Sequence, residues 1–62
     1  MYSKYWLIED ELNGLAGVEF DYHASVEEAV NQYCFEVGVE PKYVEAYPVT
    51  KTELYLSEVD IY

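Results

Sequence analysis

Arginine is absent from this sequence of 62 residues, and lysine occurs only three times, against thirteen aspartates and glutamates. The formal net charge is therefore −10 at pH 7. Without a basic patch, the chain lacks the electrostatic footprint of a nucleic-acid-binding protein. A strongly acidic surface also repels anionic membranes and attracts basic proteins. We therefore expect a basic protein as the partner, and neither nucleic acid nor a membrane.

Cysteine and long apolar runs are also scarce. Cys34 is the single cysteine, so no disulfide forms within the chain, and a lone thiol suits a reducing cytoplasm. No apolar run approaches the ~20 residues of a membrane-spanning helix. The first residues show no signal-peptide pattern. We therefore expect a cytoplasmic protein.

The residues of the common catalytic sets are missing too. His23 is the only histidine, so no Ser/His/Asp or Cys/His set can be assembled. The acidic segment of residues 9–13 offers oxygen ligands, but it lacks the spacing of an EF-hand loop, and we interpret it as a solvated turn. A domain this small also has little room for a substrate pocket. We expect no enzyme activity, no cofactor and no metal.

Hydrophobic and aromatic side chains are abundant: they make up 52% and 18% of the residues, and eight residues are tyrosines. A charge this high often marks a disordered chain, but such a content of apolar residues favours a folded core. We expect residues 1–62 to form a single acidic α+β domain, because the length suffices for one domain only.

The clearest predicted element is a helix at about residues 25–37. Ser25 and Glu28 have the spacing of a capping box, in which each side chain accepts a hydrogen bond from the backbone N–H of the other residue. Gly38 suits the left-handed position after the helix, and Pro41 prevents its continuation. The apolar residues recur with the helical period on one stripe: Val26, Ala29, Val30, Tyr33, Cys34 and Val37.

Four segments have the composition or the alternation of strands: residues 2–9, 17–23, 42–49 and 52–62. Asn13-Gly14 marks a turn between the first two. The last segment needs a bulge near Ser57-Glu58 to bring its apolar residues to one side. A short helix is the alternative there, because Thr50 and Glu53 repeat the capping-box spacing. We favour the strand, since Tyr, Leu, Val and Ile dominate the segment.

These elements predict a ββαββ domain, in which a four-stranded antiparallel sheet of order 2-1-3-4 carries one helix on one face. The residues expected to meet the helix are Val18, Phe20, Tyr22, Val44, Ala46, Leu54 and Leu56. Because one helix covers only one face, the other face is expected to be open. It would carry the alternate residues Glu19, Asp21, His23, Tyr43, Glu45, Tyr47, Glu53 and Tyr55.

A face of tyrosines and carboxylates suits an interaction with a basic protein. Tyrosine supplies rigid contact area at low entropic cost, and spaced carboxylates can take the place of phosphates in a basic groove. The alternative is that tyrosine is a good strand former and glutamate keeps the face soluble. The candidate interaction residues are Glu19, Asp21, Tyr43, Glu45, Tyr47, Glu53 and Tyr55, with Phe35 as an exposed anchor on the polar side of the helix.

In size and composition the chain resembles the nucleic-acid-mimicking inhibitors encoded by phages and other mobile elements. The resemblance rests on a small, acidic, arginine-free and aromatic-rich chain, and on no motif. It implies a non-enzymatic protein that occupies the basic site of a DNA- or RNA-binding protein. The alternative is a structural module that buries the same face in a homodimer. Its like charges oppose that alternative, because a two-fold interface would bring them together without cations.

Overall fold

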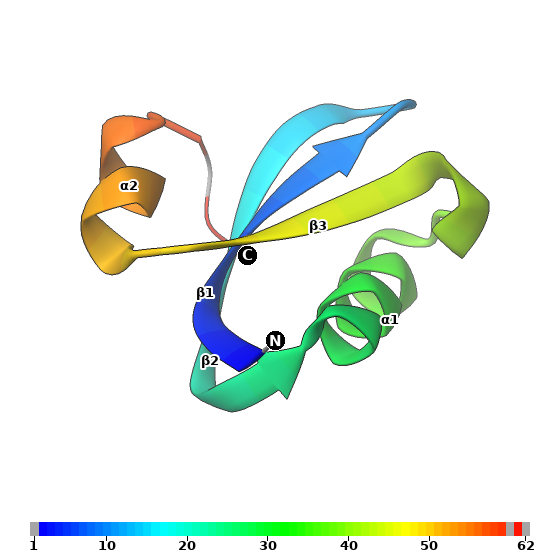
Figure 1. Ribbon diagram of the computed structural model, residues 1–62. Coiled ribbons are helices and arrows are strands. Elements are labelled where there is room, and N and C mark those ends of the chain that lie inside the picture. The colour runs from blue at the N-terminus through cyan, green and yellow to red at the C-terminus, as the bar shows by residue number, and fades with distance from the viewer. Residues whose placement is uncertain (1, 60, 62) are drawn as a thin grey trace.

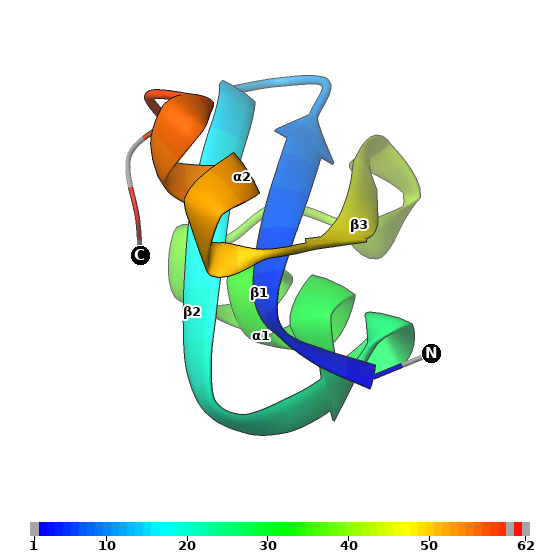
Figure 2. The same ribbon diagram turned by 60° about the vertical axis from the view of Figure 1, so that its left-hand side comes forward.

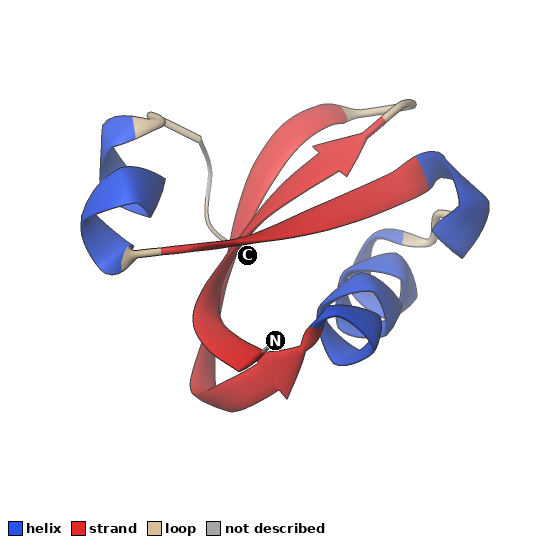
Figure 3. Ribbon diagram, viewed as in Figure 1, coloured by secondary structure: helices blue, strands red, loops and turns tan. Residues whose placement is uncertain are grey.

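The computed structural model describes residues 2–59 and 61 (Figure 1). Its elements are β1 (Tyr2–Asp10), β2 (Gly14–Ser25), α1 (Val26–Val37), the short 3₁₀ helix η1 (Pro41–Tyr43), β3 (Val44–Val49) and α2 (Lys51–Leu56). The α+β class and the antiparallel sheet are confirmed (Figure 3). The predicted fourth strand and the single helix are wrong, because the described residues form three strands and two α-helices.

β1 is the central strand of a sheet with the order β2-β1-β3, and it is antiparallel to both neighbours. The neighbours expected for the first three strands are therefore confirmed. Gly14, the first residue of β2 after the turn, has a left-handed conformation with φ of 93°, which glycine adopts without steric penalty. The pairing of β1 with β2 shifts register between Ser3 and Tyr5.

The expected capping groups define both ends of α1. The Ser25 hydroxyl accepts a hydrogen bond from the Glu28 backbone N–H at 3.2 Å, and Glu28 Oε1 accepts one from the Ser25 N–H at 2.9 Å. Gly38 follows the helix with φ of 82°, and its N–H donates to the Cys34 carbonyl at 2.8 Å. These contacts satisfy backbone groups that the helix ends leave without partners.

The main core lies between α1 and one face of the sheet. It consists of Trp6, Ile8, Ala16, Val18, Ala29, Tyr33, Cys34 and Val44. Trp6 and Ile8 come from the central strand and are fully buried. The Trp6 indole N–H donates to the Ser3 carbonyl at 2.9 Å, so its polar atom is satisfied. Tyr22 and Val26, which were expected in this core, are exposed instead.

The C-terminal segment forms α2 where a fourth strand was preferred, and its N-terminal capping box explains why. The Thr50 hydroxyl accepts from the Glu53 N–H at 3.1 Å, while Glu53 Oε1 accepts from the Thr50 N–H at 3.0 Å. A terminal edge strand would leave a row of unpaired backbone groups. Residues 60 and 62 of the predicted strand lie outside the described residues, and Ile61 bridges to Gly17 of β2.

The two helices lie on opposite faces of the sheet, as Figures 1 and 2 show together. α2 packs against β1 and fully buries Leu54, whereas Leu56 is 76% exposed. Placing Leu54 and Leu56 beneath α1 was therefore wrong. The expectation of a wholly open second face was wrong for the same reason, because α2 covers part of it.

Candidate interaction surface

The face of the sheet that points away from α1 carries two glutamates on neighbouring strands. Glu9 of β1 and Glu45 of β3 are direct cross-strand partners, and both side chains are exposed. We call Glu9 and Glu45 the acidic pair. Like charges directly opposite one another destabilise a sheet. The pair therefore weakens the fold of the isolated protein.

Tyr47 joins the acidic pair on β3. Its hydroxyl donates a hydrogen bond to Glu45 Oε2. This bond raises the pKa of Tyr47, because ionisation of the phenol would remove the donor and place a second negative charge beside Glu45. The charge of Glu9 raises it further, which places Glu9, Glu45 and Tyr47 in one electrostatic cluster.

The lysines leave the acidic pair without a cation. Within residues 2–59 and 61, the one ion pair joins Lys42 Nζ to Glu40 Oε2 at 3.3 Å, on an exposed surface. Lys42 also lies over the ring of Tyr43, at 5.2 Å from its centroid, and Lys51 lies over Tyr55 at 5.8 Å. Among the described residues, no lysine therefore forms an ion pair with Glu9 or Glu45.

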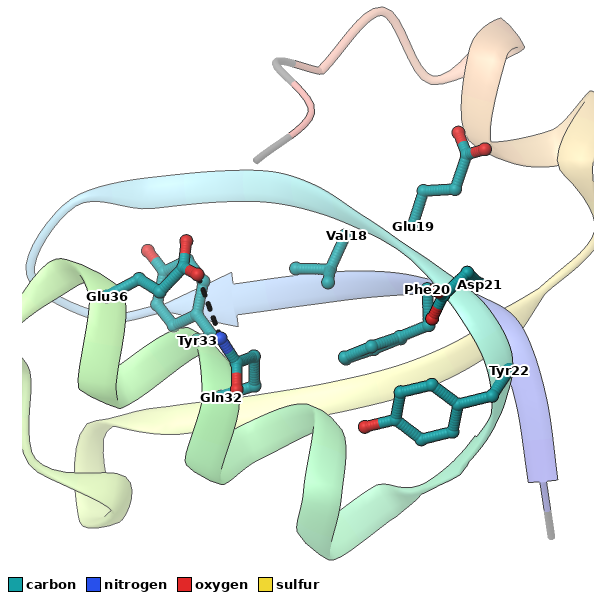
Figure 4. Close-up of a pocket in the computed structure, with 8 residues that line it drawn as sticks. All are labelled: Val18, Glu19, Phe20, Asp21, Tyr22, Gln32, Tyr33 and Glu36. Atoms are coloured by element: carbon teal, nitrogen blue, oxygen red, sulfur yellow. Dashed lines mark hydrogen bonds between the residues drawn. The ribbon is translucent and has the colours of Figure 1, made fainter.

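The predicted interaction residues do not share one face. Glu19, Glu45 and Tyr47 are exposed on the strands, and Figure 4 shows the Glu19 carboxylate pointing away from α1. Tyr43 ends η1 and is half-buried, so its assignment to a strand was wrong. Phe35 is 85% exposed on α1, as expected for an anchor.

Two further predicted residues belong to α2. Hydrogen bonds with the backbone N–H and the side chain of Thr50 lower the pKa of Glu53. The Glu53 carboxylate is thus part of the capping box of α2. Tyr55 is half-exposed and pairs with Lys51. Removing Glu53 would disturb α2 itself, and for this reason Glu53 is a poor choice for testing binding.

Asp21, the remaining predicted residue, borders a groove between β2 and α1 (Figure 4). The groove has a volume of about 440 Å³. The rings of Phe20 and Tyr22 meet edge-to-face in it, with centroids 5.4 Å apart. Its lining comprises Val18, Glu19, Phe20, Asp21, Tyr22, Gln32, Tyr33 and Glu36. The sequence did not reveal this groove: Phe20 packs against the core as expected, but Tyr22, which was also expected beneath the helix, is exposed.

Asp10 is buried at the end of β1, unlike the other acidic residues that the structure describes. It accepts hydrogen bonds from the Tyr33 hydroxyl at 2.6 Å, from the Leu12 N–H at 2.8 Å, and from the backbone and side-chain N–H groups of Asn13 at 3.2 and 2.9 Å. These bonds, that of Tyr33 foremost, lower the pKa of Asp10 to about 2. The segment of residues 9–13 is therefore organised around hydrogen-bond donors of the protein.

No cluster of three or more His, Cys, Asp or Glu side chains in the described part of the chain is arranged to hold a metal ion. None of the helices described is long and apolar enough to cross a membrane. Comparisons with protein-family models, with curated proteins and with solved structures find no match to this chain.

Proposed function

We propose that this chain is a non-enzymatic interaction protein that occupies a basic site on a DNA- or RNA-binding protein. The acidic pair carries this proposal. Two adjacent carboxylates beside the ring of Tyr47 present negative charge and an aromatic surface, which are the features that a nucleic-acid-binding site recognises. The repulsion within the acidic pair lowers the stability of the free protein. This is consistent with a binding role for the pair, because binding sites are often retained at the expense of stability.

The rest of the surface supports the same proposal. Every acidic residue described, apart from Asp10, is exposed. With a net charge of −10, their summed field attracts a basic partner over distance and raises the association rate. A homodimer through the acidic pair would instead bring four carboxylates together without cations, so this alternative is disfavoured.

Binding of a short, capped peptide of alternating glycine and arginine tests the proposal. Calorimetry should detect binding at low salt that weakens steeply towards physiological salt, because exposed charges are screened over about 8 Å there. The double variant Glu9→Gln with Glu45→Gln should bind about fivefold to tenfold more weakly. A labelled DNA oligonucleotide bound to the same peptide should be released when the protein is added.

A matched reference variant separates the acidic pair from the overall charge. Glu27→Gln with Glu58→Gln removes the same charge from exposed positions in the first turn of α1 and after α2, and should weaken binding less than about twofold. The melting temperature should rise in Glu9→Gln, since the cross-strand repulsion is removed. Equal weakening in both double variants, or a natural protein that binds no peptide at low salt, would refute the proposal; sedimentation as a dimer would then favour the homodimer.

A further inference from the structure

The groove between β2 and α1 combines aromatic rings with carboxylates, and none of the described residues that line it has a cationic side chain. Figure 4 shows the rings of Phe20 and Tyr22 extending from β2 towards α1, with Tyr33 on the helix. Tyr22 is 46% exposed and Phe20 is half-buried, so ring surface is accessible from solvent. Aromatic rings attract cations through their negative faces.

Carboxylates from two different elements border these rings. Asp21 belongs to β2 and Glu36 to α1, and both are exposed. The Gln32 side-chain amide donates to Glu36 Oε1 at 2.8 Å, as drawn in Figure 4. This bond restricts the Glu36 side chain before any ligand arrives, which reduces the entropy lost on binding. The groove therefore offers negative charge beside accessible ring surface.

We infer that this groove takes up an arginine side chain of the basic partner, an inference that rests on the proposed function. A guanidinium group is planar and weakly hydrated, so it can stack on a ring and donate to carboxylates at the same time. Lysine has a compact, strongly hydrated ammonium group without that plane. An anionic ligand would be repelled by Asp21 and Glu36, and a neutral ligand would gain no attraction from their charges. Charge complementarity thus selects the occupant.

NMR titration with the capped glycine–arginine peptide tests this inference, with the matching glycine–lysine peptide beside it. The side-chain amide signals of Gln32 and the ring signals of Tyr22 should shift on addition of the arginine peptide. The groove variant Asp21→Asn with Glu36→Gln should bind it about fivefold to tenfold more weakly. The reference variant Glu27→Gln with Glu58→Gln, which removes the same charge, should bind less than about twofold more weakly.

Tyr22 supplies a test that leaves the charge unchanged. Tyr22→Leu should weaken binding about twofold to fivefold, because it removes one ring face, while Tyr22→Phe should bind as the natural protein does. Equal binding of the lysine peptide would overturn the assignment to arginine. Binding that weakens equally in the groove and reference variants would overturn the groove and leave the proposed function standing. A natural protein that binds neither peptide at low salt would overturn the proposed function itself.

Discussion

Leu54→Ala is the substitution that most directly tests the arrangement of the two helices on opposite faces of the sheet. Leu54 is fully buried against the sheet, and it is the one buried residue of α2. Leu56 lies two residues further along the same helix and is 76% exposed. Leu56→Ala therefore makes the same chemical change in the same helix without a buried site.

The size of the effect follows from the buried carbon atoms. Changing leucine to alanine removes three of them, and burial of each contributes roughly 0.8 kcal/mol. The cavity that remains adds to this, so Leu54→Ala should lower the free energy of unfolding by about 2–4 kcal/mol. A domain of 62 residues has a total of about 3–9 kcal/mol at the usual value per residue. The variant should therefore be marginally stable, whereas Leu56→Ala should change stability by less than about 0.5 kcal/mol.

Urea unfolding followed by the fluorescence of Trp6 measures both variants, since Trp6 is buried in the core and becomes exposed on unfolding. In a four-stranded sheet, Leu54 and Leu56 would share a face, and the two substitutions would have similar effects. Similar losses at the two positions, or an unchanged midpoint for Leu54→Ala, would refute the packing of α2 described above.

Two further predictions concern Asp10 and Gly38. The pKa of Asp10 is lowered from 3.8 to about 2 in the folded protein. The ionised carboxylate therefore stabilises the fold fully above pH 3.8, and this stabilisation is lost as the pH falls to about 2. Across this pH range, the free energy of unfolding should accordingly fall less steeply in Asp10→Asn than in the natural protein. Urea titrations that give the same pH dependence for both proteins would contradict the role of Asp10. Gly38→Ala should lower stability by about 1 kcal/mol, from left-handed backbone strain alone, because nothing lies within 4 Å of the added carbon. An unchanged melting temperature would show that the helix end relaxes without strain.

α1 could be predicted from the sequence because its signals are local. Ser25, Glu28 and Gly38 lie within one turn of the helix ends, and the structure uses each as a cap. The C-terminal segment had two conflicting local signals, a β-prone composition and the capping box of Thr50 and Glu53. Tertiary packing favours the helix there, since β1 offers a second apolar surface on which a single leucine can be buried.

The sequence of β1 already indicates this second apolar surface. Trp6 and Ile8 lie on one side of the strand, and Tyr5 and Leu7, both half-buried, lie on the other. A strand that is apolar on both sides is typical of a sheet covered on both faces. Reading this pattern would have favoured an element packed against the second face, and so the helix over a fourth strand.

The acidic pair was harder to foresee, because it depends on register. Glu9 was assigned both to the end of the first strand and to the acidic turn, and its cross-strand partner was not predicted; β1 continues to Asp10, which places Glu9 opposite Glu45. A shift of one residue would have moved Glu45 to the other face of the sheet and separated the two charges. Composition predicts how many charges the surface carries, whereas strand pairing decides which of them meet.

The distance between these charges, relative to the screening length, determines which of them can act together on a partner. The molecule measures 27 × 22 × 16 Å along its principal axes, while screening at physiological salt acts over about 8 Å. Charges at opposite ends of the molecule therefore hardly influence one another there. The repulsion that a partner can relieve is concentrated where carboxylates are neighbours, as in the acidic pair, and the net charge of −10 acts mainly on the rate of encounter. The recognition that we propose therefore rests on local sites, and among the described residues the acidic pair and the groove beside α1 each place exposed carboxylates next to accessible aromatic rings.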